Sequence, residues 1–247
     1  MMQNRTLGLE AACSAVSWTT LDKKHLWGRN YDFDRLAEGT GMTFLPRGLK
    51  YQGVVSDEKM PAPHTAAYAC AGVGILMEPT PVLYEGMNEK GLMGGQLYYR
   101  GFASYEKVSG PDEHSLQPPF LVYHLLAQCA SVEEAVLWLQ TKIKLADIPF
   151  FGTVPPLHWS FHDASGETIV VEPDRDGLHI YRNTLGVMTN SPGYSWHRLN
   201  LLNYAGLRDG DYPTVELDGE TLDQCFSGSG FQGLPGVRPP ALCVWLF

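Results

Sequence analysis

Residues 157–182 carry the pattern that most restricts the fold of this chain. They read LHWSFHDASGETIVVEPDRDGLHIYR, three apolar and β-branched runs divided by Asp-Ala-Ser-Gly and Asp-Arg-Asp-Gly. Short runs separated by turn residues predict consecutive antiparallel strands, a β-meander. Residues 80–99, TPVLYEGMNEKGLMGGQLYY, surround Asn-Glu-Lys-Gly with two more apolar runs and predict a further hairpin. Much of the core must therefore be antiparallel sheet.

Two consecutive helices are predicted in the middle of the chain. Residues 120–130 have helical apolar spacing, and residues 131–144 begin with Ser131 and Glu134 at capping-box spacing and end in lysines. Strand patterns recur at 41–55 and 64–77, and residues 183–207 read as a strand, a Ser-Pro turn and a helix. Because strands outnumber helices and the two middle helices are adjacent, we expect a single α+β domain with antiparallel sheet layers and helices packed outside.

Composition excludes several classes of protein. With 44% hydrophobic and 18% charged residues the chain can bury a full core, and its net charge of −9 disfavours nucleic acid and anionic membranes as partners. No apolar run approaches membrane-spanning length. The cysteines are odd in number, scattered and without CxxC spacing, which indicates a reducing compartment, and we expect a cytoplasmic protein. They are Cys13, Cys70, Cys129, Cys225 and Cys243.

The usual cofactor and hydrolase motifs are missing. The SGSG at 227–230 is not a serine nucleophile elbow, and the Gly-rich pieces GGQ and GVG complete no nucleotide-binding loop. His158 and His162 fall on one face of a predicted strand, too far apart for one metal ion. We therefore expect neither a metal nor a cofactor.

Cys13 lies in a predicted hairpin. Residues 14–18 form one strand, a second opens at 26–27, and the connection 19–24 is polar. If Trp18 pairs with His25, Cys13 falls opposite Asn30.

Arg29 and Asp32 then lie within a residue or two of the Cys13 sulfur. A guanidinium stabilises a thiolate, so this placement predicts a lowered thiol pKa and a reactive cysteine. A buried structural cysteine is the commoner alternative. If Cys13 began the mature chain, its own α-amino group, with a pKa of about 7.7–8.0, could serve as the general base, held by Asp32.

Several segments together resemble the choloylglycine hydrolase family, the bile salt hydrolases and penicillin V acylases, which are N-terminal-nucleophile amidases. The hairpin ending in GRNYDFD is similar to theirs, as are the segments 80–99, 155–174 and 186–207, in the family's order. The resemblance covers roughly residues 13–236, and blocks of this length are far more specific than a short pattern. It implies an αββα sandwich of antiparallel sheets with outer helices.

The resemblance also implies the site residues. It places the nucleophile on Cys13, the arginine of the second strand on Arg29 and the amine-holding aspartate on Asp32. The asparagine of TNSP falls on Asn190, whose side chain would join the oxyanion hole. The strand GLMGGQLYY places Tyr98 where bile salt hydrolases typically have Asn and penicillin V acylases have Tyr, and its backbone N–H would be the second oxyanion donor.

We therefore expect a cysteine amidase that hydrolyses a linear amide C–N bond of a small molecule, most similar to penicillin V acylases. A bile salt hydrolase or an N-acyl homoserine lactone acylase is the alternative. From another class, the chain could be an inactive family member that only binds amides. The resemblance implies a homotetramer for a complete chain.

The two ends of the chain carry further expectations. Residues 1–12 contain one arginine and no apolar core, so they are not a secretory signal, and we expect their removal before Cys13. After Gly236 the sequence departs from the family pattern, whose catalytic arginine falls near Leu242 or Cys243, while Arg238 lies too early. We therefore expect the domain 13–247 to be incomplete at its C-terminus, weakly active or inactive, and poorly soluble.

Overall fold

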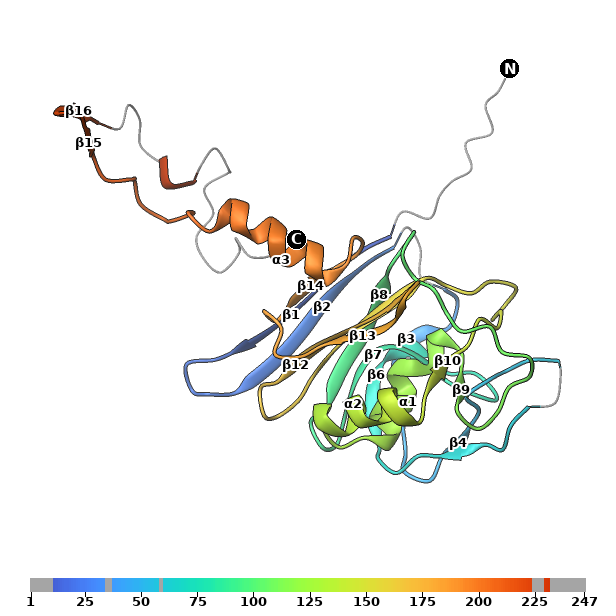
Figure 1. The fold of residues 1–247 in the computed structure, drawn as a ribbon. Coiled ribbons are helices and arrows are strands. Elements are labelled where there is room, and N and C mark those ends of the chain that lie inside the picture. Colours follow the sequence, from blue (N-terminus) through green and yellow to red (C-terminus); the bar gives the residue numbers. More distant parts are fainter. Residues whose placement is uncertain (1–10, 34–36, 58–59, 224–228, 232–247) are drawn as a thin grey trace, which may run out of the picture. The chain divides into compact units, whose positions relative to one another are not determined.

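The structure, a computed structural model, describes residues 11–33, 37–57, 60–223 and 229–231 (Figure 1). The chain divides into two compact units, Met1–Gly193 and Tyr194–Phe247. The expectations that concern residues 1–10 and 232–247 lie outside the described residues, as do Cys225 and Cys243.

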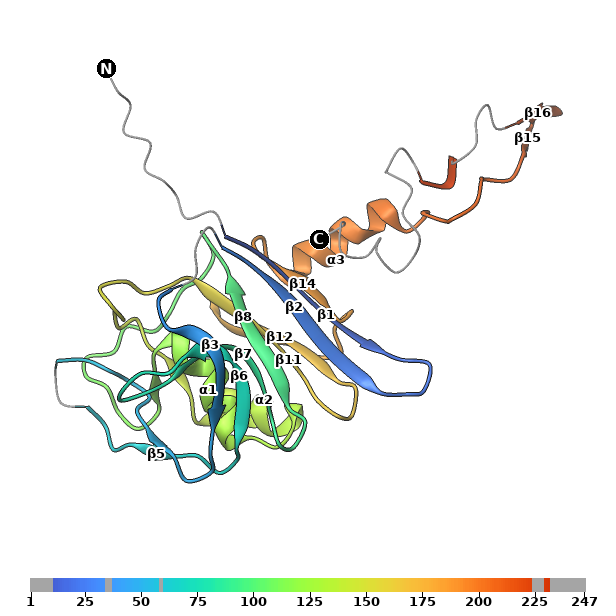
Figure 2. The same cartoon turned by 180° about the vertical axis from the view of Figure 1, so that it is seen from behind.

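A seven-stranded antiparallel sheet forms the centre of the first unit (Figure 2). Its strands, in spatial order, are β13 (Gly177–Tyr181), β12 (Thr168–Asp174), β11 (Leu157–His162), β8 (Met93–Tyr98), β7 (Val82–Asn88), β6 (Cys70–Ile75) and β3 (Thr40–Leu45). The predicted β-meander is confirmed as β11, β12 and β13, and the predicted hairpin at 80–99 as β7 and β8. The region 41–55 holds two strands, because β3 ends before a turn and β4 (Lys50–Tyr51) follows it.

A second sheet of three strands has the order β14-β1-β2. Strands β1 (Ala11–Thr19) and β2 (His25–Phe33) form the predicted first hairpin, and β14 (Val187–Thr189) pairs with β1. Two pairs of two-residue strands complete the first unit: β4 with β5 (His64–Thr65), and β9 (Ser115–Leu116) with β10 (Lys144–Leu145).

Glycines in the large sheet reveal how the layers are stacked. Gly86 and Gly94 are cross-strand partners and share one face, whereas Gly95 lies on the other. A Cβ on Gly86 would meet Leu126 of the helical layer at 3.1 Å, and one on Gly95 would meet Trp27 of β2 at 2.9 Å. The helices and the three-stranded sheet therefore cover opposite faces of the large sheet.

The helical layer consists of α1 (Leu121–Gln128) and α2 (Val132–Thr141), preceded by the 3-10 turn η1 (Pro118–Phe120) (Figure 1). The predicted cap is confirmed, since the Ser131 side chain accepts a hydrogen bond from the Glu134 N–H at 3.3 Å. The predicted helix at 131–144 is too long at its end, because Lys144 belongs to β10 and pairs with Asp112 at 3.0 Å.

Helix α1 packs against β7 and β8 of the large sheet and is buried at every residue except Gln128, and the apolar residues of α2 belong to the same core. The layered α+β arrangement predicted from sequence is thus present in the first unit: helices, large sheet, small sheet.

The second unit contains α3 (Tyr194–Asn200), the 3-10 turns η2 (Leu201–Tyr204) and η3 (Ser229–Phe231), and the hairpin of β15 (Val215–Leu217) and β16 (Glu220–Leu222). The helix α3 begins after the Ser-Pro turn, as predicted for 183–207. Among all described helices, none is long and apolar enough to cross a membrane.

Candidate active site

The hairpin of β1 and β2 places the candidate residues, in a register one position away from the predicted one. Trp18 lies opposite Leu26, so Cys13 is paired with Tyr31 and not with Asn30. The prediction of Cys13 opposite Asn30 is therefore wrong by one residue.

The turn of this hairpin explains the difference. The N–H of Thr20 donates to the carbonyl of Lys24 at 2.9 Å, which leaves a loop of residues 21–23, and Lys23 takes the left-handed conformation with φ 64°. Such three-residue loops end in a left-handed residue and close on a pair separated by four positions. The predicted pairing of Trp18 with His25 placed six residues, 19–24, in the connection, and their polar composition alone does not determine the loop length.

The register decides which side chains face the large sheet. Cys13 and its partner Tyr31 share the inner face of the hairpin with Arg29, since side chains alternate along a strand. Asp32 falls on the outer face, where its carboxylate accepts a hydrogen bond from the Asn30 side chain at 2.9 Å. The backbone N–H of Asp32 hydrogen-bonds the Cys13 sulfur and lowers the thiol pKa, whereas the negative charge of its carboxylate raises it.

Cys13 is fixed through all its polar atoms. Its N–H donates to Oδ1 of Asn190 at 2.7 Å, its carbonyl accepts from the Thr189 hydroxyl at 2.8 Å, and its Sγ lies 3.3 Å from Nη2 of Arg29. The residue is only 2% exposed. The nitrogen of Cys13 is thus bound by Asn190 and not by the Asp32 carboxylate.

Asn190 connects two sheets. It follows β14, which pairs with β1, and its Nδ2 donates to the carbonyl of Tyr98 in β8 at 2.8 Å. One side-chain amide therefore bridges Cys13 and Tyr98, residues 85 positions apart in the sequence.

The N–H of Tyr98 points to the same side as that carbonyl. The neighbouring Tyr99 N–H donates to Pro156 at 2.8 Å, in the ladder between β8 and β11. Successive residues of an antiparallel ladder direct their N–H and C=O groups to opposite sides. The backbone groups of Tyr98 are accordingly directed away from β11 and toward Asn190.

Arg29 is held between the two sheets, with a side chain only 1% exposed. Its Nη1 donates to the carbonyls of Tyr84, at 3.2 Å, and of Gln96, and its Nε lies 3.0 Å from Oε2 of Glu85. The guanidinium also lies over the Tyr31 ring at 4.7 Å.

Burial raises the pKa of the Cys13 thiol, and the Arg29 guanidinium beside it opposes that shift without reversing it. The predicted lowering of the thiol pKa is therefore wrong in net direction, because desolvation of a thiolate outweighs one nearby cation here. A thiol of this kind needs a base to remove its proton.

A cavity of about 720 Å³ opens at Cys13. Aromatic rings form much of its wall. The ring centroid of Tyr31 lies 4.3 Å from that of Phe33 and 5.1 Å from that of Tyr84, and both pairs are stacked. The ring centroids of Phe33 and Tyr98 lie 5.5 Å apart. Further apolar lining residues are Ile75, Met77, Val82, Leu97, Phe150, Phe151 and Leu157. A cavity with this lining fits an apolar or aromatic group.

The structure thus brings Cys13, Arg29, Tyr98 and Asn190 together, and Asp32 meets the Cys13 sulfur through its backbone while its carboxylate lies on the outer face of the hairpin. The sequence reasoning missed Phe33 and Glu85. Phe33 could have been found from the alternation of β2, whereas Glu85 sits in a different sheet and carries no local signal.

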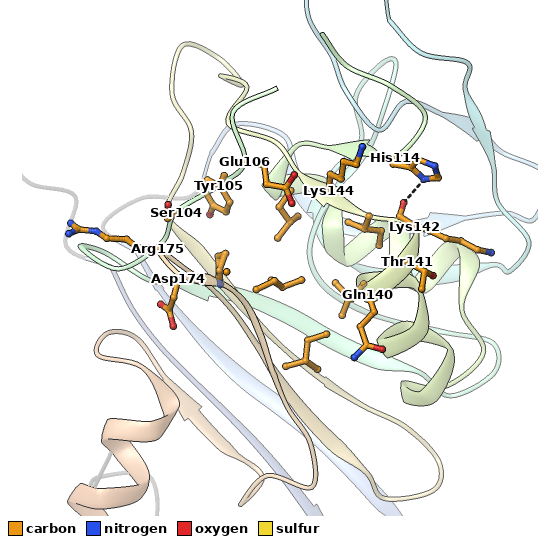
Figure 3. Close-up of a pocket in the computed structure, with 17 residues that line it drawn as sticks. Ser104, Tyr105, Glu106, His114, Gln140, Thr141, Lys142, Lys144, Asp174 and Arg175 are labelled. Carbon is orange, nitrogen blue, oxygen red and sulfur yellow. Dashed lines mark hydrogen bonds between the residues drawn. The ribbon is translucent and has the colours of Figure 1, made fainter. Parts of the chain in front are cut away.

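A second cavity, of about 640 Å³, lies away from Cys13, between α2, β10 and the β12–β13 hairpin (Figure 3). Its rim carries charged side chains, including Lys142, Lys144 and Arg175. His114 lies beside it and makes a 3.1 Å hydrogen bond with the Lys142 carbonyl.

One group among the described residues has the composition of a metal site. The ligand atoms of Asp174, Asp176 and His179 lie within 4.8 Å of one another. His179 already pairs with Asp176 at 2.9 Å, which raises the pKa of the imidazole. His158 and His162 point to separate partners, Glu172 and Thr168.

Comparison with known families gives one match over most of the chain. The sequence profile of the linear amide C–N hydrolases, choloylglycine hydrolase family, matches residues 13–243. The match begins at Cys13.

The curated relatives include proteins named bile salt hydrolase/transferase. That of Clostridium perfringens is 33% identical over 231 residues, covering 93% of this chain and 68% of the relative. That of Lactiplantibacillus plantarum is 34% identical over 226 residues, covering 91% of this chain and 66% of the relative. The chain therefore spans about two thirds of the length of these relatives.

Solved structures of two hydrolases are similar to this chain in fold. An arginine-to-leucine variant of conjugated bile acid hydrolase from Clostridium perfringens has a TM-score of 0.75 at 33% identity and covers 93% of this chain and 69% of that one. Penicillin V acylase from Agrobacterium tumefaciens has a TM-score of 0.64 at 24% identity, covering 78% and 56%, a likeness of fold alone. These neighbours confirm the predicted fold class, the layered α+β sandwich of N-terminal-nucleophile hydrolases.

Proposed function

The chain belongs to the choloylglycine hydrolase family of linear amide C–N hydrolases, and from this premise we propose that the group around Cys13 is its active site. The surroundings of Cys13 carry the proposal. The sulfur of Cys13 lies 3.3 Å from Nη2 of Arg29, and the nitrogen of Cys13 is bound by Asn190. Cys13 also lines the aromatic cavity. A nucleophile, a cation and a hydrogen-bonding amide thus meet where a substrate could enter.

The solved relatives support this assignment. The Clostridium perfringens hydrolase was solved once with a cysteine replaced by alanine and once with an arginine replaced by leucine. Those two positions are separated by 16 residues, as are Cys13 and Arg29.

In the proposed reaction the α-amino group of Cys13 takes the proton of the thiol, and Sγ attacks the carbonyl carbon of the amide. The oxyanion that forms accepts hydrogen bonds from the Tyr98 N–H and from the Asn190 side chain, each donor contributing ~2.7–4 kcal/mol. The C–N bond then breaks, and the leaving amine takes the proton from the α-ammonium group. Water hydrolyses the thioester and returns the thiol.

This mechanism requires a free amine at Cys13. While Ala12 precedes it, the nitrogen of Cys13 is a peptide nitrogen, which is no base at neutral pH. We therefore propose that residues 1–12 are removed and that the domain starts at Cys13, where the family match also starts. Intact mass tests this step: an active enzyme that retains residues 1–12 would exclude the α-amine as base.

For the substrate we propose an amide with an aryl acyl group such as phenoxyacetyl, as in penicillin V. The stacked rings of Tyr31, Phe33 and Tyr84, together with Tyr98, suit a flat aromatic group. A conjugated bile acid is the second candidate, favoured by the names of the relatives at 33% and 34% identity.

Steady-state kinetics test both parts of the proposal. Cys13→Ser is expected to lose nearly all hydrolysis of penicillin V and glycocholate, and Cys70→Ser and Cys129→Ser, buried in the core, are the matched controls. A higher kcat/KM for penicillin V supports the aryl substrate, and a higher value for glycocholate overturns it. Tight binding without turnover by the unaltered chain would point to an inactive binding protein.

Assembly and location are also proposals. From the family resemblance we propose a homotetramer, which light scattering of purified protein measures directly. We propose a cytoplasmic location because the cysteines in the described part of the chain, Cys13, Cys70 and Cys129, are all free thiols. Subcellular fractionation tests this assignment.

A further inference from the structure

Glu85 is a half-buried carboxylate between the two sheets. It lies on β7 opposite Gly95, on the face that the three-stranded sheet covers. Its side chain is 25% exposed, against 1% for its partner Arg29, and Oε2 lies 3.0 Å from Nε of Arg29. Within the described part of the chain, Oε2 has no hydrogen bond of good geometry, so the ion pair is its main polar contact.

Stability is a poor reason for this pair. Burying a charge costs several kcal/mol, which applies fully to Arg29 and in part to the half-buried Glu85, and a well-packed apolar pair of similar volume is often as stable. The sheet is also shaped to admit it. A Cβ on Gly95 would lie 3.2 Å from Cβ of Glu85 and 2.9 Å from the Trp27 ring, so the glycine leaves room for both side chains.

Each nitrogen of the Arg29 guanidinium has its own partners. Nη1 donates to the carbonyls of Tyr84 and Gln96, and Nε faces Glu85 and, at 3.3 Å, the carbonyl of Asn30. This arrangement leaves Nη2 to face the Cys13 sulfur at 3.3 Å.

We propose that Glu85 is a positioning residue, whose carboxylate fixes Nε of Arg29 so that Nη2 stays against Sγ of Cys13. The proposal rests on the proposed function of Cys13 and Arg29. The proposed site otherwise consists of Cys13 and Arg29 of the small sheet, Tyr98 of β8 and Asn190. Glu85 adds a residue of β7.

The thiol pKa of Cys13 distinguishes a positioning role of Glu85, through Arg29, from a direct effect of the Glu85 charge. Burial has the largest effect on the pKa of the Cys13 thiol, followed by the charge of Arg29, while Asp32 contributes through its backbone and its charge. Tyr31 and Tyr98 also face the thiol and remain neutral, since burial raises the pKa of both phenols. Removing the Glu85 carboxylate would by itself lower the thiol pKa, so a rise in the Glu85 variant reports movement of Arg29 away from the sulfur.

The test is the pH dependence of Cys13 alkylation by iodoacetamide, followed by peptide mass, in the unaltered chain and in Glu85→Ala. If Glu85 positions Arg29, the guanidinium moves away and the thiol pKa rises in the variant. Hydrolysis of penicillin V or glycocholate should lose kcat on the order of 10- to 100-fold, with KM nearly unchanged, as for a misplaced catalytic group.

The matched control is Glu89→Gln. Glu89 also pairs with an arginine, Arg47, but on the surface and away from Cys13. This variant should keep the thiol pKa and kcat of the unaltered chain. If the alanine variant does not fold, Glu85→Gln, which keeps the shape of the side chain, replaces it. It should also raise the thiol pKa and lower kcat, each by less than Glu85→Ala.

A thiol pKa that falls or does not move in Glu85→Ala overturns the proposal, even if the melting temperature drops. In Arg29→Lys, adding Glu85→Ala should cause little further change, because coupled residues are non-additive. Full additivity would also overturn it. Failure of the proposed function is a separate result, namely that Cys13→Ser retains full turnover.

Discussion

Replacing Asn190 with alanine removes a side chain that joins the Cys13 nitrogen to β8. The hydrogen bonds lost include that from the Cys13 N–H at 2.7 Å and that to the Tyr98 carbonyl at 2.8 Å. At about 1 kcal/mol each, these two losses lower the free energy of unfolding by about 2 kcal/mol. The lost oxyanion donor should lower kcat further, on the order of 10²- to 10³-fold.

Thr189→Val is the matched control for this experiment. It removes a hydrogen bond of similar length to the same cysteine, from the Thr189 hydroxyl to the Cys13 carbonyl at 2.8 Å. It should therefore cost about 1 kcal/mol of stability and leave kcat within a few-fold.

The assay combines kcat on the better of the two substrates with urea unfolding of each variant. A second variant, Asn190→Asp, keeps the acceptor for the Cys13 nitrogen but turns the donor into a carboxylate, which repels an oxyanion. It should be at least as inactive as Asn190→Ala. If Asn190→Ala keeps kcat within threefold, or if Thr189→Val loses as much, Asn190 is only structural and the reasoning fails.

Two further predictions concern stability. Gly94→Ala should destabilise the fold by ~1–3 kcal/mol, because its Cβ would lie 2.2 Å from the Phe161 ring, whereas Gly41→Ala has nothing within 4 Å and should be neutral in the same urea unfolding experiment. Burial, with a smaller contribution from His64, lowers the pKa of His124 to about 3. The neutral imidazole thus stabilises the fold above its unfolded pKa of about 6.5, and this stability is lost as pH falls from there toward 3. Melting temperatures between pH 7 and pH 4 should fall less steeply for His124→Gln, and equal slopes would refute this.

Local sequence patterns predicted the elements of the fold well. The turns at 163–166 and 174–177 separate three strands because each places glycine where the backbone is left-handed, with φ 89° at Gly166 and 134° at Gly177. Ser131 and Glu134 likewise determine where α2 begins. Such signals lie within a few residues of each other, so the sequence contains them completely.

Two kinds of detail could not be predicted: a turn without its usual residues, and contacts between distant residues. The register of the first hairpin follows from the left-handed conformation of Lys23, a position where glycine or asparagine would have been the recognisable signal. The pKa of Cys13 depends on how deeply the large sheet buries it, and the partner of Arg29 comes from β7. The placement of Asp32 on the outer face follows from the same shift of register.

Trapping of the acyl-enzyme identifies the nucleophile directly. Purified chain is mixed with penicillin V or glycocholate, quenched in acid within the first turnover and digested, and the peptides are weighed. The acyl group is expected on a peptide that begins at Cys13. An acyl group on any other residue, or turnover by Cys13→Ala at the rate of the unaltered chain, would contradict it.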